Sequence, residues 1–357
     1  MNIVDATRSY EAWLAKQIPL IRADVDEKHL LMQDSPFALL RGAFYRWLTV
    51  WNELPQKIAS ATRVLAEGDL HVENFGTWRD REGRLVWGIN DFDESATLPW
   101  TLDIVRLATS ALLATDALGV ALKPRAIVEA IETGYRDVMR SGGEPFVLAE
   151  HHVWLRRIAE NQLRDPQAFW KKLSSLPAAG SIPAPARKAL LAALPERGIP
   201  VRLARRRAGV GSRGHLRFVA LAKWRGGLLA RETKALAPSA IAWADARAST
   251  RVRYPEIVSR AVRCPDPGFA IHGNWIVRRL APDCAKVNAS DLPDTSLEAS
   301  MLQAMGREAA NVHLGSSGAL RGVRRDLARL KKNWLLDAAK EMAKATEHDW
   351  KDWRKRR

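Results

Sequence analysis

Four polar side chains in the N-terminal third of the sequence have the types and the spacing that phosphoryl transfer needs. Asp69 and Asn74 stand five residues apart in the segment Gly68–Asn74, and Asp91 and Asp93 follow beyond a predicted hairpin. Transfer from a nucleoside triphosphate needs a carboxylate that accepts the hydroxyl proton and oxygen ligands that hold Mg²⁺ on the phosphates. We therefore predict Asp69 as the base, Asn74 and Asp91 as metal ligands, and Asp93 as a supporting or second-metal group.

Plainer interpretations exist for these residues. Asp or Asn beside glycine, as in Gly68-Asp69, is typical of a turn. Asp103 stands at the start of an apolar helical segment, where capping of that helix is its ordinary role. The cluster Asn90–Glu94 shifts the balance toward function, because so many carboxylates beside one strand cost stability unless a cation relieves them.

A glycine-rich loop lies far downstream, between two predicted strands. Its residues have the spacing G-x-G-x-x-G, and we expect Gly209, Gly211, Ser212 and Gly214 to cover the phosphates with backbone N–H groups. A dinucleotide-binding loop of this spacing opens a helix, whereas Leu216–Lys223 is rich in strand-forming residues. The context therefore favours a β-hairpin whose loop closes over a triphosphate.

The acidic segments resemble the signatures of known enzymes. Asp69-Leu-His-Val-Glu-Asn74 resembles the catalytic loop of protein kinases, Asp-Leu-Lys-Pro-Glu-Asn, and His71 stands where those enzymes carry lysine. Asp91-Phe-Asp93 resembles their metal-binding Asp-Phe-Gly. The form Gly-Asp-Leu-His…Asn, followed by Asp-Phe and a helix-starting Asp, is closer still to aminoglycoside and choline phosphotransferases. That likeness implies that Asp103 supports the catalytic loop, and we place His71 beside Asp69 among the catalytic residues, with its role open.

A longer resemblance involves three segments together. Ser35–Gly42, Gly68–Gly76 and Asn90–Glu94 resemble an uncharacterised bacterial family, domain of unknown function 2252. This resemblance extends past residue 200 and covers most of the chain. It implies a family without implying a substrate.

The kinase-like resemblance also implies roles for residues beyond the glycine loop. The third predicted strand ends in Lys234, where kinases place the lysine that contacts the α and β phosphates. Its partner carboxylate should lie on the next helix, and Glu256 is the natural candidate, with Asp245 as a rival. Residues 201–231 contain many arginines and no acid, which fits a loop that surrounds a polyanion.

The order of these parts differs from the order in kinases. Kinases run glycine loop, lysine, glutamate, hinge, helix, catalytic loop and metal Asp, whereas this chain has the catalytic loop and the metal Asp first. A hinge candidate at Trp275–Arg279 and a helix at Met301–His313 follow the glycine-loop part. The sequence therefore resembles a circular permutation of the kinase-like fold, which is physically permissible when the original termini lie near each other.

These observations predict an α+β, bilobal, protein-kinase-like fold in circularly permuted order, with a mostly helical large lobe and a small antiparallel β lobe. We expect a helical lobe with the catalytic and metal-binding loops at 1–195 and a nucleotide-binding β lobe at 196–285. We expect helices that pack back on the helical lobe at 286–357. Apolar residues at helical spacing over the first fifty residues and strand candidates at Arg63–Ala66 and Arg84–Ile89 support this layout.

Length and composition set the outer limits. The chain has 357 residues and a formal net charge of +16, with 56 Lys and Arg against 40 Asp and Glu. Such a surplus attracts phosphates, nucleic acid or anionic membranes, and the tail after Leu320 is a second basic zone. No apolar run is long enough to span a membrane, the N-terminus lacks a secretory signal, and Cys264 and Cys284 have no metal-ligand spacing. We expect a cytoplasmic protein.

Three other functions stay open. A metallophosphoesterase would use Asp69-x-His71, although the later metal-binding motifs of those enzymes are missing here. His272–Trp275 resembles one of those motifs only poorly. A nucleic-acid-binding protein would use the basic faces and the 14 tryptophans, but Trp47, Trp51 and Trp87 lie in apolar patterns typical of a core. A kinase-like protein could also bind nucleotide without turnover, although every expected catalytic residue type is present. The favoured interpretation implies ATP and Mg²⁺ as cofactors and a small molecule or protein as the hydroxyl acceptor.

Overall fold

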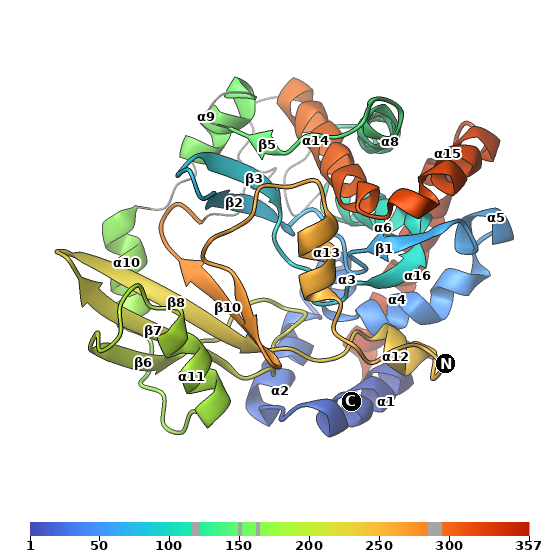
Figure 1. Ribbon diagram of the computed structural model, residues 1–357. Helices are drawn as coiled ribbons and strands as arrows, with labels where there is room; N and C mark the ends of the chain where they lie inside the picture. Colours follow the sequence, from blue (N-terminus) through green and yellow to red (C-terminus); the bar gives the residue numbers. More distant parts are fainter. Residues whose placement is uncertain (116–120, 149–151, 162–164, 285–294, 357) are drawn as a thin grey trace.

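The computed structural model describes residues 1–115, 121–148, 152–161, 165–284 and 295–356 (Figure 1). Helices make up about 51% of the chain, and the strands of the described sheets are all antiparallel. The fold is therefore α+β, as the sequence predicts.

The chain begins with a run of helices, in agreement with the apolar spacing of its first fifty residues. They are α1 (Ile3–Gln17), α2 (Arg22–Leu31), α3 (Pro36–Gly42) and α4 (Phe44–Val50), followed by the short η1 (Trp51–Glu53) and α5 (Gln56–Ala59). Polar caps fix two of the helix starts. The side-chain oxygen of Asn2 accepts a hydrogen bond from the backbone N–H of Asp5, and that of Ser35 accepts one from Ala38.

Two small sheets flank the acidic segments. β1 (Arg63–Ala66) pairs with β4 (Ala96–Pro99), and β2 (Phe75–Arg79), β3 (Leu85–Ile89) and β5 (Phe146–Val147) form a three-stranded sheet. β4 leads directly into α6 (Trp100–Leu113), which is buried along most of its length. The acidic segments are thus the connections 67–74 and 90–95, which join strands of the two different sheets.

Long helices from the C-terminal part of the chain pack behind α6. α14 (Thr295–Leu314) crosses α8 (Pro124–Ser141), and α16 (Trp334–Lys355) packs along α6. Two glycines bring α8 and α14 close together. A Cβ on Gly134 would lie 2.0 Å from the carbonyl oxygen of Gln303, and one on Gly306 would lie 2.1 Å from that of Ile131. Between α14 and α16 the chain forms η3 (Ser317–Ala319) and α15 (Leu320–Arg329). A further helix, α9 (Val153–Asn161), follows β5.

The glycine-rich loop belongs to a five-stranded antiparallel sheet. Its strand order is β6 (Val201–Arg205), β7 (Arg217–Trp224), β8 (Gly227–Ala235), β10 (Trp275–Leu280) and β9 (Ala270–His272), and α12 (Ile241–Ala244) and α13 (Tyr254–Arg260) lie between β8 and β9 in the chain. Side chains alternate across β7, so α10 (Pro166–Ser174) packs on the face with Val219 and Leu221. α11 (Ala184–Ala192) packs on the opposite face, which carries Phe218 and Ala220.

The packing of this region differs in two places from the layout expected from the sequence. The domain boundary expected at residue 195 would separate α10 and α11 from the sheet that they cover. The hinge candidate Trp275–Arg279 is most of strand β10, which pairs with β8 on one side and β9 on the other. Its apolar and β-branched residues reflect a place inside a sheet, where such side chains pack well.

The tryptophans that the sequence assigns to the core are buried there. Trp47 and Trp51 are each 4% exposed and Trp87 is 1% exposed, so none of the three offers a ring face for stacking with a base. Within the described residues, none of the helices combines the length and the apolar character that crossing a membrane requires.

Replacing Gly134 by alanine tests the close crossing of α8 and α14. Alanine favours a helix by about 1 kcal/mol over glycine. We nevertheless expect Gly134→Ala to lower the free energy of unfolding by roughly 1–3 kcal/mol, because the new methyl group overlaps the backbone of α14. Urea denaturation measures the change. Gly180→Ala is the control, since a Cβ there meets no atom within 4 Å. Equal stability of the two variants would contradict the close crossing.

Candidate active site

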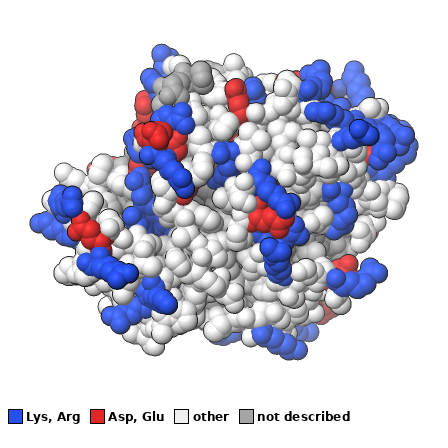
Figure 2. Space-filling view, viewed as in Figure 1, with Lys and Arg blue, Asp and Glu red and all other residues white. Residues whose placement is uncertain are grey.

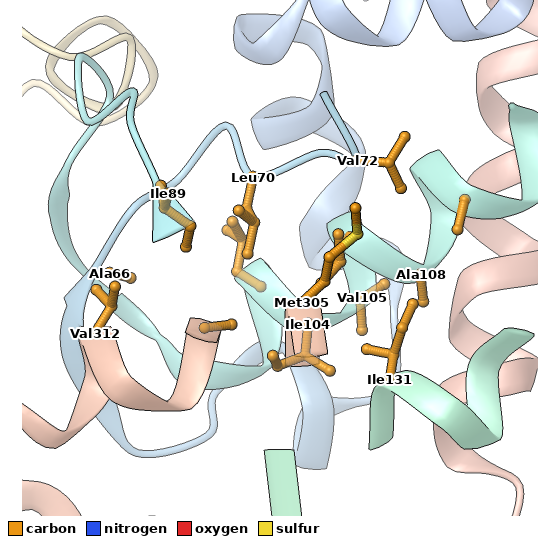
Figure 3. Close-up of a cluster of buried hydrophobic side chains, with 14 of the residues drawn as sticks. Ala66, Leu70, Val72, Ile89, Ile104, Val105, Ala108, Ile131, Met305 and Val312 are labelled. Atoms are coloured by element: carbon orange, nitrogen blue, oxygen red, sulfur yellow. The ribbon is translucent and has the colours of Figure 1, made fainter. Parts of the chain in front are cut away.

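Successive side chains of the connection between β1 and β2 point alternately into a cavity and into the core. Its odd-numbered residues from Glu67 to Glu73 line a cavity of ≈ 110 Å³. Leu70 and Val72 instead lie in the core, where Figure 3 shows them in one cluster with Ile104 and Val105 of α6 and Met305 of α14. The apolar residues of the segment therefore anchor it, and the polar residues between them face the cavity.

Two side chains of α6 hold the backbone of this segment. Asp103 accepts hydrogen bonds from the backbone N–H groups of Glu67 at 2.8 Å and Gly68 at 2.9 Å. Ser110, two turns further along, accepts one from the backbone N–H of Val72 at 3.1 Å. All of these groups are buried, where an unpaired backbone N–H would be costly, so the contacts fix the course of the loop.

Asp103 does not cap its own helix, the plainer interpretation of its position. α6 begins at Trp100, with Pro99 at the N-cap position, and Asp103 lies in its first turn. Its Oδ2 also lies 3.0 Å from Nε2 of His313, which is fully buried at the end of α14. Asp103 thus contacts the 67–74 segment, the part of the chain that the phosphotransferase resemblance expects it to support.

Asp69 is oriented by a buried arginine. Nε of Arg106 donates to Asp69 Oδ1 at 2.9 Å, and Nη2 donates to the same oxygen and, at 2.7 Å, to the carbonyl of Leu40. The guanidinium lies over the rings of Phe44 and Trp47, at 5.0 and 4.8 Å from their centroids. Burial raises the pKa of Asp69 to about 6, against the lowering effect of Arg106. A carboxylate held this way combines a fixed orientation with an increased affinity for a proton.

His71 and Asn74 close the loop by hydrogen bonds to each other. Asn74 Oδ1 accepts from the backbone N–H of His71 at 2.6 Å, and Nδ1 of His71 accepts from the backbone N–H of Glu73 at 3.2 Å. The backbone carbonyl of Asn74 accepts from Asn90 at 2.9 Å, which ties this loop to the second acidic segment. Asn74 and His71 both line the cavity.

The second acidic segment meets the lysine at the end of β8. Nζ of Lys234 lies 4.0 Å from Asp91 Oδ1 and donates to Asp93 Oδ2, and Arg278 of β10 lies 3.9 Å from Asp91 Oδ1. Burial would raise the pKa of Asp91, but Lys234 and Arg278 outweigh it and lower the pKa to about 2. Burial and the charge of Asp91 raise the pKa of Asp93. The two neighbouring carboxylates therefore differ in their affinity for a proton.

The glycine-rich loop lies directly over Asp69. Gly209 and Gly214 have φ of +75° and +102°, a backbone conformation that glycine adopts without strain. A Cβ on Gly211 would lie 3.7 Å from Asp69 Oδ2. Ser212, whose hydroxyl accepts a hydrogen bond from an arginine of β7, lines the cavity together with Gly209 and Gly211. Segments more than a hundred residues apart thus meet at one cavity.

Helix α2 holds this loop and the strand before it. Asp24 pairs with Arg205 at 2.8 Å, and Glu27 pairs with Arg213 at 2.5 Å. The backbone N–H of Ile21 donates to the carbonyl of Gly214 at 2.9 Å. Arg205 and Arg213 therefore pair with acids of α2, a use that differs from the polyanion contact expected for the arginines of this region.

The expectation that Glu256 is the partner of Lys234 is wrong. The carboxylate of Glu256 pairs with Arg253 at 2.6 Å and Arg260 at 3.0 Å, its neighbours three and four residues away on α13. Helical spacing brings those side chains together whatever the tertiary fold. Lys234 finds its carboxylates in the second acidic segment, and Glu256 does not line the cavity. The rival Asp245 pairs with Arg247 on the surface.

Several residues that line the cavity or orient its side chains escaped the sequence analysis. Arg106 had a local signal, since Asp103, Arg106 and Ser110 recur at helical spacing within an otherwise apolar helix. Arg41, which pairs with Glu73 at 2.9 Å, lies in the segment Ser35–Gly42. Other lining residues gave no local signal because only the tertiary fold brings them to the cavity. They are Tyr10, Lys28, Tyr45 and His215.

The donor set fits an oxygen-ligated cation such as Mg²⁺. Asn74 and Asp91 line the cavity together, and the Oδ1 atoms of Asp91 and Asp93 are buried without a hydrogen-bond partner in the described part of the chain. Mg²⁺ binds through one or two protein oxygens when phosphate and water oxygens complete its octahedron. Across the described ranges, no group of three or more His, Cys, Asp or Glu side chains is arranged to hold a metal ion by itself.

Comparison with known proteins supports the family resemblance for one part of the chain. Residues 20–171 match a bacterial family described as "Uncharacterized protein conserved in bacteria (DUF2252)". The match includes the segments 35–42, 68–76 and 90–94 but ends before the glycine-rich loop, so it is shorter than the resemblance expected from the sequence. Neither the curated proteins nor the solved structures give a match.

Substitution of Asp103 tests the support of the loop. We expect Asp103→Asn to destabilise the protein by about 1–3 kcal/mol, because the amide nitrogen replaces one of the two oxygens that accept buried backbone N–H groups. Chemical denaturation gives the difference. Asp26→Asn, which removes an exposed ion pair with Arg22, is the matched control and should change stability by less than about 0.5 kcal/mol. A similar small change for Asp103→Asn would contradict the support.

Glu94 gives the protein a pH-dependent stability. Its Oε2 accepts hydrogen bonds of 2.7 Å from the hydroxyl of Ser239 and the backbone of Ala240, yet burial raises its pKa from 4.5 to about 7. Between those values the folded state holds a proton that the unfolded state releases, so stability falls as pH rises and levels off above about 7. We expect Glu94→Gln to make this slope shallower, measured by urea unfolding from pH 4 to 8, while other buried acids such as Glu308 keep part of it. Glu129→Gln, at an exposed site, should leave the slope unchanged.

Proposed function

We propose that this protein is an ATP- and Mg²⁺-dependent phosphotransferase of the kinase-like type that acts on a hydroxyl acceptor, most simply a small molecule. The observation that carries the proposal is the convergence of two distant segments. Lys234 lies 4.0 Å from Asp91, and Gly211 covers Asp69, so residues predicted for catalysis, metal binding and phosphate binding meet at one cavity, which Asp69, Asp91 and Gly211 line.

Each side chain has a part that follows from its geometry. Asp69 accepts the proton of the acceptor hydroxyl, and Arg106 keeps its Oδ2 turned toward the glycine loop. Backbone N–H groups of Gly209–Gly214 bind the phosphates, and Lys234 keeps the two carboxylates Asp91 and Asp93 in place. Mg²⁺, held by Asn74 and Asp91, would supply the positive charge that neutralises the phosphate oxygens.

The course of the chain supports a bilobal, circularly permuted kinase-like fold as part of the proposal. In kinase order, the helix after the glycine-loop sheet leads into the catalytic loop. Here α14 follows that sheet, and its end lies beside β1. Ser316, just past α14, accepts a hydrogen bond of 2.8 Å from the backbone of Leu65, and His313 contacts Asp103. The two chain positions that a kinase would join are therefore neighbours in space.

A metallophosphoesterase based on Asp69-x-His71 stays a prediction of the sequence. Both side chains line the cavity, but Oδ1 of Asp69 is engaged by Arg106 and Nδ1 of His71 accepts a backbone N–H. Hydrolysis of a simple phosphodiester with Mn²⁺, without any use of ATP, would favour this alternative.

The nucleic-acid alternative rests on a different part of the surface. Figure 2 shows Lys and Arg side chains gathered over α15 at the upper right, where Arg321, Arg325 and Arg329 are exposed. These arginines follow one another at four-residue steps, so they share one face of the helix. Because these arginines do not line the cavity, they would contribute to a surface that binds a partner and would take no part in the proposed reaction.

Asp69→Asn separates nucleotide binding from turnover. The asparagine keeps an oxygen for Arg106 but cannot accept the hydroxyl proton. General-base catalysis contributes about 10²–10⁴-fold, so we expect turnover to fall by that factor. A rise in melting temperature with Mg-ATP should remain in the variant. The assay is ADP release over a panel of hydroxyl acceptors. Wild-type protein whose melting temperature no Mg-nucleotide raises would overturn the proposed function.

A further inference from the structure

A buried lysine of helix α2 lines the same cavity without a carboxylate partner. The side chain of Lys28 is 5% exposed, and its Nζ donates to the backbone carbonyl of Gly211 at 3.2 Å. Nζ also lies 5.7 Å from the ring centroid of Tyr45. An ammonium group has three N–H donors, and among the described residues the carbonyl of Gly211 is the acceptor that it reaches. Burial lowers the pKa of Lys28, which reflects the cost of this environment for a charge.

The other cations near the cavity are already neutralised. Lys234 contacts Asp93 and Asp91, and Arg41, which lines the cavity, pairs with Glu73 at 2.9 Å. Within the described residues, Lys28 is therefore the lysine or arginine of the cavity wall that has no ion pair. Glu11, Asp69 and Glu94 act on the charge of Lys28 from a distance, but among the described contacts none of them forms an ion pair with it. Its ammonium group therefore keeps N–H donors that an anionic ligand could use.

The position of Lys28 indicates which part of a bound nucleotide it would contact. Its hydrogen-bond acceptor, Gly211, is the loop residue that lies over Asp69. In a phosphotransferase, the phosphoryl group that moves must lie next to the base that activates the acceptor. The nearest anionic group to Lys28 would then be the terminal phosphate, and the inner phosphates would lie further from Asp69.

We propose that Lys28 binds the terminal phosphate of the bound nucleoside triphosphate, with Nζ exchanging the carbonyl of Gly211 for a phosphate oxygen. This assignment rests on the proposed function and adds to it a phosphate ligand from a helix that precedes the catalytic loop and lies outside the kinase-like pattern. Ion pairs of Asp24 with Arg205 and of Glu27 with Arg213 fix α2 to the glycine-loop hairpin, so Lys28 is held where the phosphate would bind. Lysine is a common phosphate ligand because its charge is compact.

The substitution Lys28→Met tests this role, because methionine fills a similar volume without the charge. Calorimetric titration would compare a non-hydrolysable Mg-ATP analogue with Mg-ADP. We expect the variant to lose about tenfold or more in affinity for the ATP analogue and less than about threefold for ADP, since a hydrogen bond to a charged group is worth at least a factor of ten. Lys28→Arg should restore part of the loss. Arg22→Met, an exposed position on the same helix, should change neither affinity.

A structural role for Lys28 predicts a different result. If Lys28 only ties α2 to the loop, Lys28→Met lowers the melting temperature of the ligand-free protein and weakens both nucleotides equally. If it is a phosphate ligand, removal of its unpaired charge leaves the melting temperature equal or higher, because buried charges often give way to apolar groups without loss. An unchanged ratio of the two affinities would overturn the assignment while leaving the phosphotransferase proposal in place.

Titration with inorganic tripolyphosphate and Mg²⁺ keeps the two proposals separate. If the wild-type protein binds no nucleotide, the proposed function fails, and the tripolyphosphate titration still decides the role of Lys28. A loss of about tenfold or more in Lys28→Met would support a polyphosphate site that uses this lysine. Equal binding by both proteins, or none by either, would overturn it.

Discussion

The candidate site depends on the polar residues that α6 buries against the 67–74 segment. That segment has no helix or strand of its own between β1 and β2, so its backbone N–H groups need partners from elsewhere. Asp103, Arg106 and Ser110 lie on one side of α6 and contact the loop one after another. Asp103 and Ser110 accept hydrogen bonds from its backbone N–H groups, and Arg106 donates to the side chain of Asp69. All three side chains are buried, so these contacts take the place of hydrogen bonds to water. They fix the backbone conformation of the loop. The apolar faces of α8, α14 and α16 hold α6 itself in place.

Burial and charge together give neighbouring acids different protonation states. The protein carries a net charge of +16, yet its cavity wall is rich in carboxylates. Lys234 and Arg278 hold the pKa of Asp91 near 2, which keeps it ionised and suited to bind a cation. Burial raises the pKa of Asp69 to about 6 and that of Glu94 to about 7, so these groups exchange protons near neutral pH. Acids separated in this way have different chemical roles in one small space.

The sequence was most informative where local signals decide the structure. Glycine spacing between two strand-like runs predicted the hairpin β6–β7, and the short apolar run Arg63–Ala66 predicted β1. It failed where two local explanations competed or where a contact is purely tertiary. The kinase-like order predicted that Glu256 pairs with Lys234, but in the structure its carboxylate pairs with Arg253, three residues away. Lys28 had no signal at all, because a lysine in an amphipathic helix is ordinarily solvated and only the approach of the glycine loop buries it.

The small size of the cavity connects Lys28 to the motion of the glycine loop. A volume of ≈ 110 Å³ is below the roughly 300–1,000 Å³ that ligand sites usually have, so the proposed nucleotide would require the loop to move away from Asp69. Gly211 is both the residue over Asp69 and the acceptor for Lys28. Movement of the loop alone would therefore break the hydrogen bond between Lys28 and Gly211 and leave the ammonium group open to an incoming phosphate. If α2 instead moves with the loop, through the ion pairs of Asp24 and Glu27, Lys28 leaves Asp69 together with the loop. In both cases an anion bound at Lys28 would favour the closed position further, because it would compensate the charge that closing buries.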